Sequence, residues 1–173
     1  MTLNVPLLVA VPAILVAAVA TGADVRARRI PNWLTFPALF AGIALHAMTG
    51  GLSGAGNAAF GVLVAGGVLL PGWYMGWMAA GDVKLCAAVG AFLGYPLALM
   101  MVLLSLMAGG LLSLAVAARH RVLRRSLFGA AILGAWAANS VAGSAPPPVT
   151  SGIRFPFAAA VLCGVACSLC LRT

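Results

Sequence analysis

Long apolar stretches recur along this chain and constrain its fold more than any other feature. Stretches of 18 or more mostly apolar residues are found from one end to the other, and each is long enough to cross a bilayer as a helix. Hydrophobic residues make up 64% of the chain and charged residues 7%, whereas a soluble domain has about 25% charged residues. We therefore predict an all-α, polytopic transmembrane helix bundle, with residues 1–173 in one membrane-embedded domain.

Turn and proline signals divide the apolar sequence into segments, which we expect at about residues 3–22, 32–48, 57–78, 81–94, 96–118 and 153–171. The first segment lacks a basic flank and a convincing cleavage site, so we interpret it as a retained span rather than a cleaved signal peptide. Pro71 and Gly72 predict a kink in the third segment. The fourth has about 12 residues before the turn signal at Gly94, roughly 18 Å of helix, which is too short to cross a bilayer alone.

The positive charge of the chain predicts its orientation in the membrane. Ten Lys and Arg against two Asp give a net charge of +8, which in a soluble protein would indicate nucleic acid as a partner. No nucleic-acid recognition fold accompanies these cations, so we expect them to set topology and contact anionic lipids. With about six spans and an outer N-terminus, the positive-inside rule places nine of the ten cations on the cytoplasmic side. These are Arg26, Arg28, Arg29, Lys84, Arg119, Arg121, Arg124, Arg125 and Arg154.

One stretch leaves the number of spans open. Residues 119–152 form a predicted cytoplasmic loop, and its middle, residues 126–142, is apolar enough to be a seventh span. A seventh span would leave eight of the ten cations inside, so the charge rule favours six spans by a small margin. A surface-lying helix with basic flanks fits the stretch equally well.

The four cysteines predict neither a metal site nor a disulfide framework. Cys163, Cys167 and Cys170 recur on one face of the last apolar segment, which is typical of a stripe of small packing residues. Cys167 and Cys170 form one CxxC, but a structural zinc needs about four ligands. No second CxxC or His pair lies nearby, and Cys86 is far away in the sequence. We expect no structural metal and no cofactor.

Asp24 and Asp82 are the only carboxylate side chains in the sequence. In the six-span arrangement both lie at the cytoplasmic ends of their segments, at one depth, and a carboxylate near lipid is costly enough to need a reason. Separately, Asp24 could pair with a neighbouring arginine, and Asp82 could cap a helix or complement its dipole. Together, paired carboxylates can share one proton, so that the ionised member activates water while the protonated one polarises a carbonyl.

Two sequence motifs surround these acids. The first is ADVRARRIPNWLT at residues 23–35, and the second is AAGDVKLCAAVGAFLG at residues 79–94. They resemble the Asp-then-basic-then-IPN-x-LT and GxGD-x-KL signatures of type IV prepilin peptidases. A weaker similarity to the family's final helix is found in RFPFAAAVLCG at residues 154–164. The small size is similar to that of the compact peptidases of tight-adherence (Flp-type) pilus systems.

This resemblance implies a GxGD-type aspartyl protease of the bacterial inner membrane. Such an enzyme removes the short cytoplasmic leader from type IV prepilin-like substrates, with its active site at the cytoplasmic face. By transfer, Asp24 and Asp82 are the catalytic pair. The same motifs contain Pro31, Asn32, Ala79, Gly81 and Lys84 as supporting residues. The resemblance implies neither a metal nor an oligomeric state.

The residue types in and near these motifs also suggest individual structural roles. Ala79 replaces the first glycine of GxGD, and we expect the retained Gly81 to supply backbone freedom beside Asp82. Lys84 is interpreted as snorkelling to the membrane surface, or else as tuning the acid pair. Asn32 and Thr35 are candidate caps of the second segment. Gly90 and Gly94 predict a close helix contact that holds Asp82 near Asp24, because they form a small-xxx-small pair.

Two other functions compete with the peptidase interpretation. A proton-coupled transporter would also keep intramembrane acids, but it predicts acids near the midplane and repeated halves. The sequence has no evident internal repeat. A non-catalytic membrane scaffold of a pilus assembly system is the other alternative, and Ala79 keeps it open.

Overall fold

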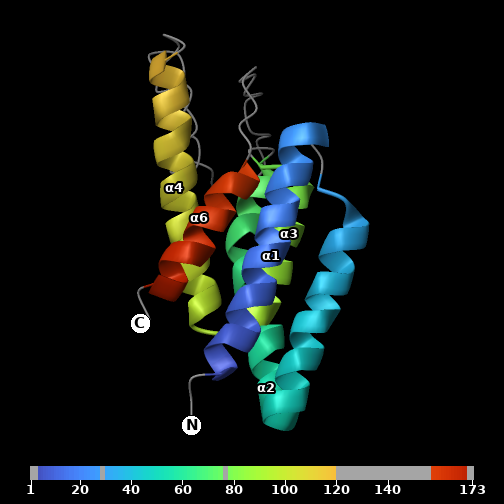
Figure 1. Ribbon diagram of the computed structural model, residues 1–173. Helices are drawn as coiled ribbons and strands as arrows, with labels where there is room; N and C mark the ends of the chain where they lie inside the picture. Colours follow the sequence, from blue (N-terminus) through green and yellow to red (C-terminus); the bar gives the residue numbers. More distant parts are fainter. Residues whose placement is uncertain (1–3, 28–29, 76–77, 120–156, 171–173) are drawn as a thin grey trace, which may run out of the picture. The chain divides into compact units, whose positions relative to one another are not determined.

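The computed structural model describes residues 4–27, 30–75, 78–119 and 157–170. In these ranges every regular element is a helix, as Figure 1 shows. The helices are α1 (Asn4–Ala27), α2 (Asn32–Tyr74), α3 (Ala80–Leu93), α4 (Leu97–Arg119) and α6 (Phe157–Cys170). The all-α prediction is therefore confirmed for the described residues. The predicted cytoplasmic loop, with its apolar stretch at residues 126–142, lies outside them apart from Arg119.

The chain forms two compact units, residues 1–109 with 156–173, and residues 110–155. Helices α1, α2 and α3, the first half of α4, and α6 belong to the first unit. Both aspartates lie in it. The described part of the second unit is the last part of α4, residues 110–119.

Three of the described helices are long and apolar enough to cross a membrane. They are the Leu7–Ala27 part of α1, the whole of α2, and the Leu97–Ala115 part of α4, with mean hydropathies of 2.1, 1.5 and 2.3. By length and composition this is three spans where the sequence analysis expected about six. The expected second and third segments are joined in α2, and α3 and α6 have 14 residues each.

Helix α2 is bent at Gly51, which divides it into two legs, residues 32–50 and 52–74. Gly51 has φ 62° and ψ −147°, the one non-helical conformation within α2, and such a conformation is open to glycine and strained for other residues. Figure 1 shows the chain reversing direction there, so that the second leg returns beside the first. The backbone stays helical through Pro71 and Gly72 to Tyr74, so the kink predicted there does not interrupt the helix.

Helix α3 packs closely against the second leg of α2 through small residues. A methyl group added at Gly90 would lie 2.7 Å from the Ala65 side chain and 2.7 Å from the Gly61 carbonyl oxygen. Only glycine leaves room for this approach. At the end of α3, Gly94 has φ 63°, and the Asn57 side chain accepts a hydrogen bond from the Tyr95 backbone N–H at 3.1 Å. The close contact predicted for Gly90 and Gly94 is confirmed, although its partner is α2.

The first leg of α2 also contacts α3. The Nε2 atom of His46 lies 2.7 Å from the Phe92 carbonyl oxygen, which links the bent end of α2 to the end of α3. Between these contacts α3 is buried, with Leu85, Cys86 and Val89 fully inaccessible. Helix α3 is therefore the core of the first unit, and its first turn is held at a defined position.

Helix α1 packs on α3 and on α6. Its inner face is a row of alanines, Ala13, Ala17 and Ala20, all fully buried, which allows a close approach. The Thr21 hydroxyl lies 2.7 Å from the Ala17 carbonyl oxygen of its own helix and 3.1 Å from that of Ala158 in α6. These contacts fix the end of α1 that carries Asp24.

Candidate active site

Asp24 and Asp82 lie on neighbouring helices at positions that the packing determines. Asp24 is half-buried in the last two turns of α1, which continues to Ala27. The first segment was expected to end near residue 22, with Asp24 after it, so this placement is a correction. Asp82 lies in the first turn of α3 and is only 9% exposed. Since α1 and α3 are in contact, the two acids come from directly packed elements.

The electrostatic environment of Asp82 links it to Asp24. Asp82 lies outside the three helices that are long and apolar enough to span a membrane. The pKa of its carboxyl is raised to about 6, mainly by burial and also by the negative charge of Asp24, while a hydrogen bond with the backbone of Ala79 acts to lower it. A carboxyl that is buried beside a second carboxylate keeps its proton more readily than an isolated one.

The backbone at Ala79 explains why this position accepts alanine. Ala79 is the N-cap residue of α3, with φ −75° and ψ 145°, an extended conformation that any residue adopts. The Asp82 N–H donates to the Ala79 carbonyl oxygen at 3.0 Å. No side chain caps this helix, so the reading of Asp82 as an N-cap is wrong. Asp82 is an acid of the first turn, where it also complements the helix dipole.

Gly81 has a steric role, and the backbone freedom expected of it is not used. Within the described residues positive φ values occur at Gly51 and Gly94, whereas Gly81 is helical. A methyl group added at Gly81 would lie 3.3 Å from the Ile30 Cβ atom, a tight contact. Gly81 therefore lets the segment before α2 approach the first turn of α3 beside Asp82.

Lys84 contacts the other motif. Its Nζ donates a hydrogen bond to the Asn32 Oδ1 atom at 3.1 Å, and the same ammonium lies 5.6 Å from the centre of the Phe36 ring, within the range of a cation–π interaction. The cap predicted at Asn32 is therefore wrong. Pro31 is the N-cap of α2, and no side chain caps the helix. The Thr35 hydroxyl instead lies 3.4 Å from the Asn32 carbonyl oxygen.

The Lys84–Asn32 contact was missed by the sequence analysis, which assigned the two residues separate roles. The available signal was that both stand in the two motifs that contain the acids. Residues 52 positions apart are brought together only by the packing of α2 on α3, which no local pattern encodes.

The comparison with protein families shows which family the chain belongs to. The model of the type IV leader peptidase family matches residues 10–114. The chain belongs to the type IV leader peptidase family. The matched region contains Asp24, Asp82, Asn32 and Lys84, while α6 and the weaker motif at residues 154–164 lie beyond it. Neither the curated proteins nor the solved structures include a match to this leader peptidase.

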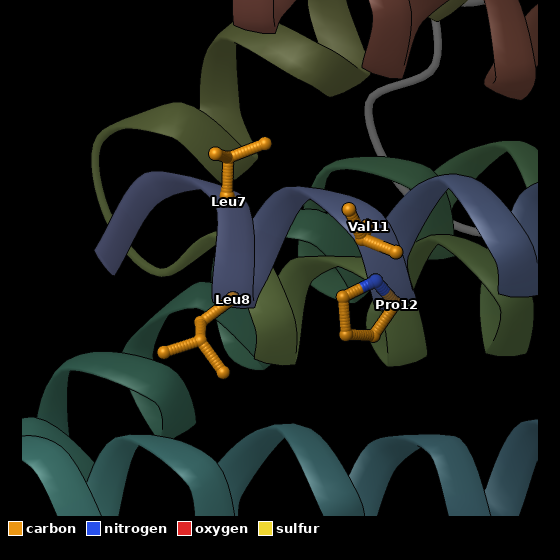
Figure 2. Close-up of a pocket in the computed structure, with 4 residues that line it drawn as sticks. All are labelled: Leu7, Leu8, Val11 and Pro12. Atoms are coloured by element: carbon orange, nitrogen blue, oxygen red, sulfur yellow. The ribbon is translucent and has the colours of Figure 1, made fainter. Parts of the chain in front are cut away.

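Other features of the described part of this leader peptidase provide fewer groups that could take part in catalysis. Within the described residues no group of three or more His, Cys, Asp or Glu side chains is gathered as a metal would require. Figure 2 shows a hollow on the N-terminal half of α1, lined by Leu7, Leu8, Val11 and Pro12. These side chains are apolar and lie three turns or more along α1 from Asp24, so the hollow holds no acid or nucleophile. The pair of aspartates is therefore the candidate active site.

Proposed function

We propose that this leader peptidase is an aspartyl endopeptidase that uses Asp24 and Asp82 as one catalytic pair. The observation that supports this most strongly is the setting of Asp82, a buried carboxyl whose pKa is raised to about 6 by burial and by the charge of Asp24. Two carboxylates that influence each other in this way favour a state in which one proton is shared between them. That state supplies an acid and a base at the same place.

The roles of the two acids follow from their surroundings. Asp82 is the more buried and holds the shared proton, with which it polarises the carbonyl of the scissile peptide bond. Asp24 takes a proton from the attacking water. The water oxygen then bonds to the carbonyl carbon, the C–N bond breaks, and the leaving nitrogen receives a proton from the pair. Each cycle consumes one water and returns the pair to its starting protonation state.

The substrate class follows from family membership. A type IV leader peptidase acts on prepilin-like proteins, and we propose that this chain removes their short leader at the cytoplasmic face of the bacterial inner membrane. The positive-inside arrangement supports this orientation, because the cations near both acids, Arg26 and Lys84, are expected on the cytoplasmic side.

The experiment is cleavage of a prepilin-like substrate by purified protein in detergent or liposomes, with the released leader identified by mass. Asp24→Asn and Asp82→Asn are each expected to abolish cleavage, because the amide keeps the shape but cannot exchange the proton. Thr49→Val, on the exposed end of the first leg of α2, is the control and is expected to cleave normally. Cleavage by a folded Asn variant at more than a few per cent of the normal rate would overturn the proposal and favour a scaffold.

A further inference from the structure

The first turn of α3 is held against the start of α2 at two points, one on either side of Asp82. Before Asp82, Gly81 packs against Ile30, and an added methyl group would lie 3.3 Å from the Ile30 Cβ. After it, the Lys84 Nζ donates to the Asn32 Oδ1 at 3.1 Å. Both contacts come from the three residues that precede and begin α2.

The connection to Asp24 is short. Helix α1 ends at Ala27, and α2 begins at Asn32, so only a few residues separate the end of the helix that carries Asp24 from the Asn32 contact. We therefore expect a shift of Asn32 relative to α3 to change the separation of the two acids. The first contact is steric and limits approach, whereas the second is a directional hydrogen bond that sets where α3 rests.

Lys84 does not act on Asp82 directly. The two residues are two positions apart in a helix, a spacing at which side chains do not face each other. The influences on the Asp82 carboxyl are burial, Asp24 and the Ala79 backbone. The Lys84 ammonium is instead directed at Asn32 and lies over the ring of Phe36, 5.6 Å from its centre.

We propose that the Lys84–Asn32 hydrogen bond is a positioning contact that holds Asp82 at its working distance from Asp24. This inference rests on the proposed function, since it concerns the same pair of acids. A hydrogen bond from a charged donor is stronger than one between neutral groups, so it links the two residues even where it is exposed. Misplacement of catalytic groups by about 1 Å is enough to lower turnover by about a hundredfold.

The test is a double-mutant cycle on cleavage of a prepilin-like substrate. Lys84→Met keeps the length of the side chain without the donor, and Asn32→Leu removes the acceptor. Each is expected to lower kcat by about tenfold or more with little change in KM, because the acids are displaced and substrate contacts are kept. The double variant is expected to be no slower than the worse single variant, as for residues that act through one contact.

Conservative variants at the contact, and one variant far from it, distinguish a positioning role from a general effect of losing positive charge. Lys84→Arg and Asn32→Asp keep a donor and an acceptor, and both are expected to restore most of the rate. Arg119→Met, which removes an exposed cation from the end of α4, is the control and is expected to leave the rate unchanged. Because the charge of Asp24 raises the pKa of Asp82, separation of the acids in Lys84→Met is expected to move the alkaline limb of kcat/KM to lower pH. Loss of a direct effect of the Lys84 charge on Asp82 would instead move this limb to higher pH and overturn the proposal.

Two further readouts distinguish failure of this inference from failure of the proposed function. If Asp24→Asn or Asp82→Asn still cleaves, the function proposed above is wrong, whatever the Lys84 variants do. The contact is then judged from thermal unfolding of the same four proteins of the cycle, where non-additive falls in the midpoint support it. Additive losses in both rate and midpoint would overturn the positioning contact while leaving the aspartyl pair in place.

Discussion

At the residue scale, the backbone conformation of Ala79 answers the main argument that the sequence raises against catalytic activity. The family motif has a glycine at this position, and alanine would be disfavoured if the position required positive φ. Its φ of −75° and ψ of 145° are instead ordinary extended values. The alanine therefore gives no structural reason to regard the chain as a scaffold that has lost its activity.

Ala79→Gly is accordingly expected to change turnover by less than about tenfold, or about 1.4 kcal/mol in barrier. The matched variant is Gly81→Ala, which is expected to slow cleavage more, because its new methyl group would press on Ile30 at 3.3 Å. Rates of prepilin cleavage by both proteins provide the measurement. A large gain in Ala79→Gly would instead indicate that alanine impairs the motif.

The pKa of Asp82 predicts the alkaline limb of activity. Because this pKa is raised to about 6, the shared proton is held below that pH and lost above it. We expect kcat/KM to fall as pH rises through about 6, with limbs that belong to the coupled pair. The same pKa shift also affects stability. The contribution of Asp82 to the stability of the folded state is fully present below its ordinary pKa of 3.8, and it is lost as pH rises through about 6. A pH–rate profile of the free enzyme measures the limb, and a kcat/KM that still rises above pH 7 would contradict the assignment.

At the element scale, the bend at Gly51 determines whether residues 32–74 form one long helix or a pair. We expect Gly51→Ala to destabilise the protein by about 1–2 kcal/mol, because its φ of 62° is strained for alanine. The adjacent Gly50→Ala is the control, since a methyl group there meets no atom within 4 Å and φ is not positive. Thermal unfolding in detergent compares the two. Equal midpoints would show that the bend does not depend on glycine.

Helix positions were predictable from the sequence wherever a local signal ends an element. The turn at Gly94 separates α3 from α4, and both helices begin within about a residue of the expected place. The continuous helical conformation of residues 32–74 was not predictable, because the glycine-rich stretch after Met48 indicates a loop. In the structure only one residue of that stretch leaves the helical conformation. Pro71, a strong signal for a kink, is accommodated within the helix.

The candidate site was predictable to a different extent. Asp24 and Asp82 could be singled out by elimination, because the chain has no other carboxylate side chain, and their motifs suggested a common role. The contacts that support them depend on the packing of helices distant in sequence. Neither the Gly81–Ile30 approach nor the Lys84–Asn32 bond follows from a period or a turn signal.

At the scale of the whole molecule, the charge distribution predicts which ends face the cytoplasm. Single cysteines introduced at Gly51 and at Arg121, which lies outside the described residues, would be labelled in intact cells with a membrane-impermeant reagent. We expect position 51 to react from outside and position 121 to be protected, because basic segments stay in the cytoplasm. The reverse pattern would move both acids to the outer face, away from a cytoplasmic leader.

The proposed mechanism requires that the two acids work as a single unit without a metal. The most direct test is the rate of prepilin cleavage by Asp24→Asn, Asp82→Asn and the double variant, with and without a metal chelator. We expect all three losses to be about equally severe, since residues of one catalytic unit are strongly non-additive. We also expect the chelator to leave the wild-type rate unchanged, because the shared proton takes the place of a metal in activating water. A double loss equal to the product of two partial single losses, or inhibition by the chelator, would contradict the account.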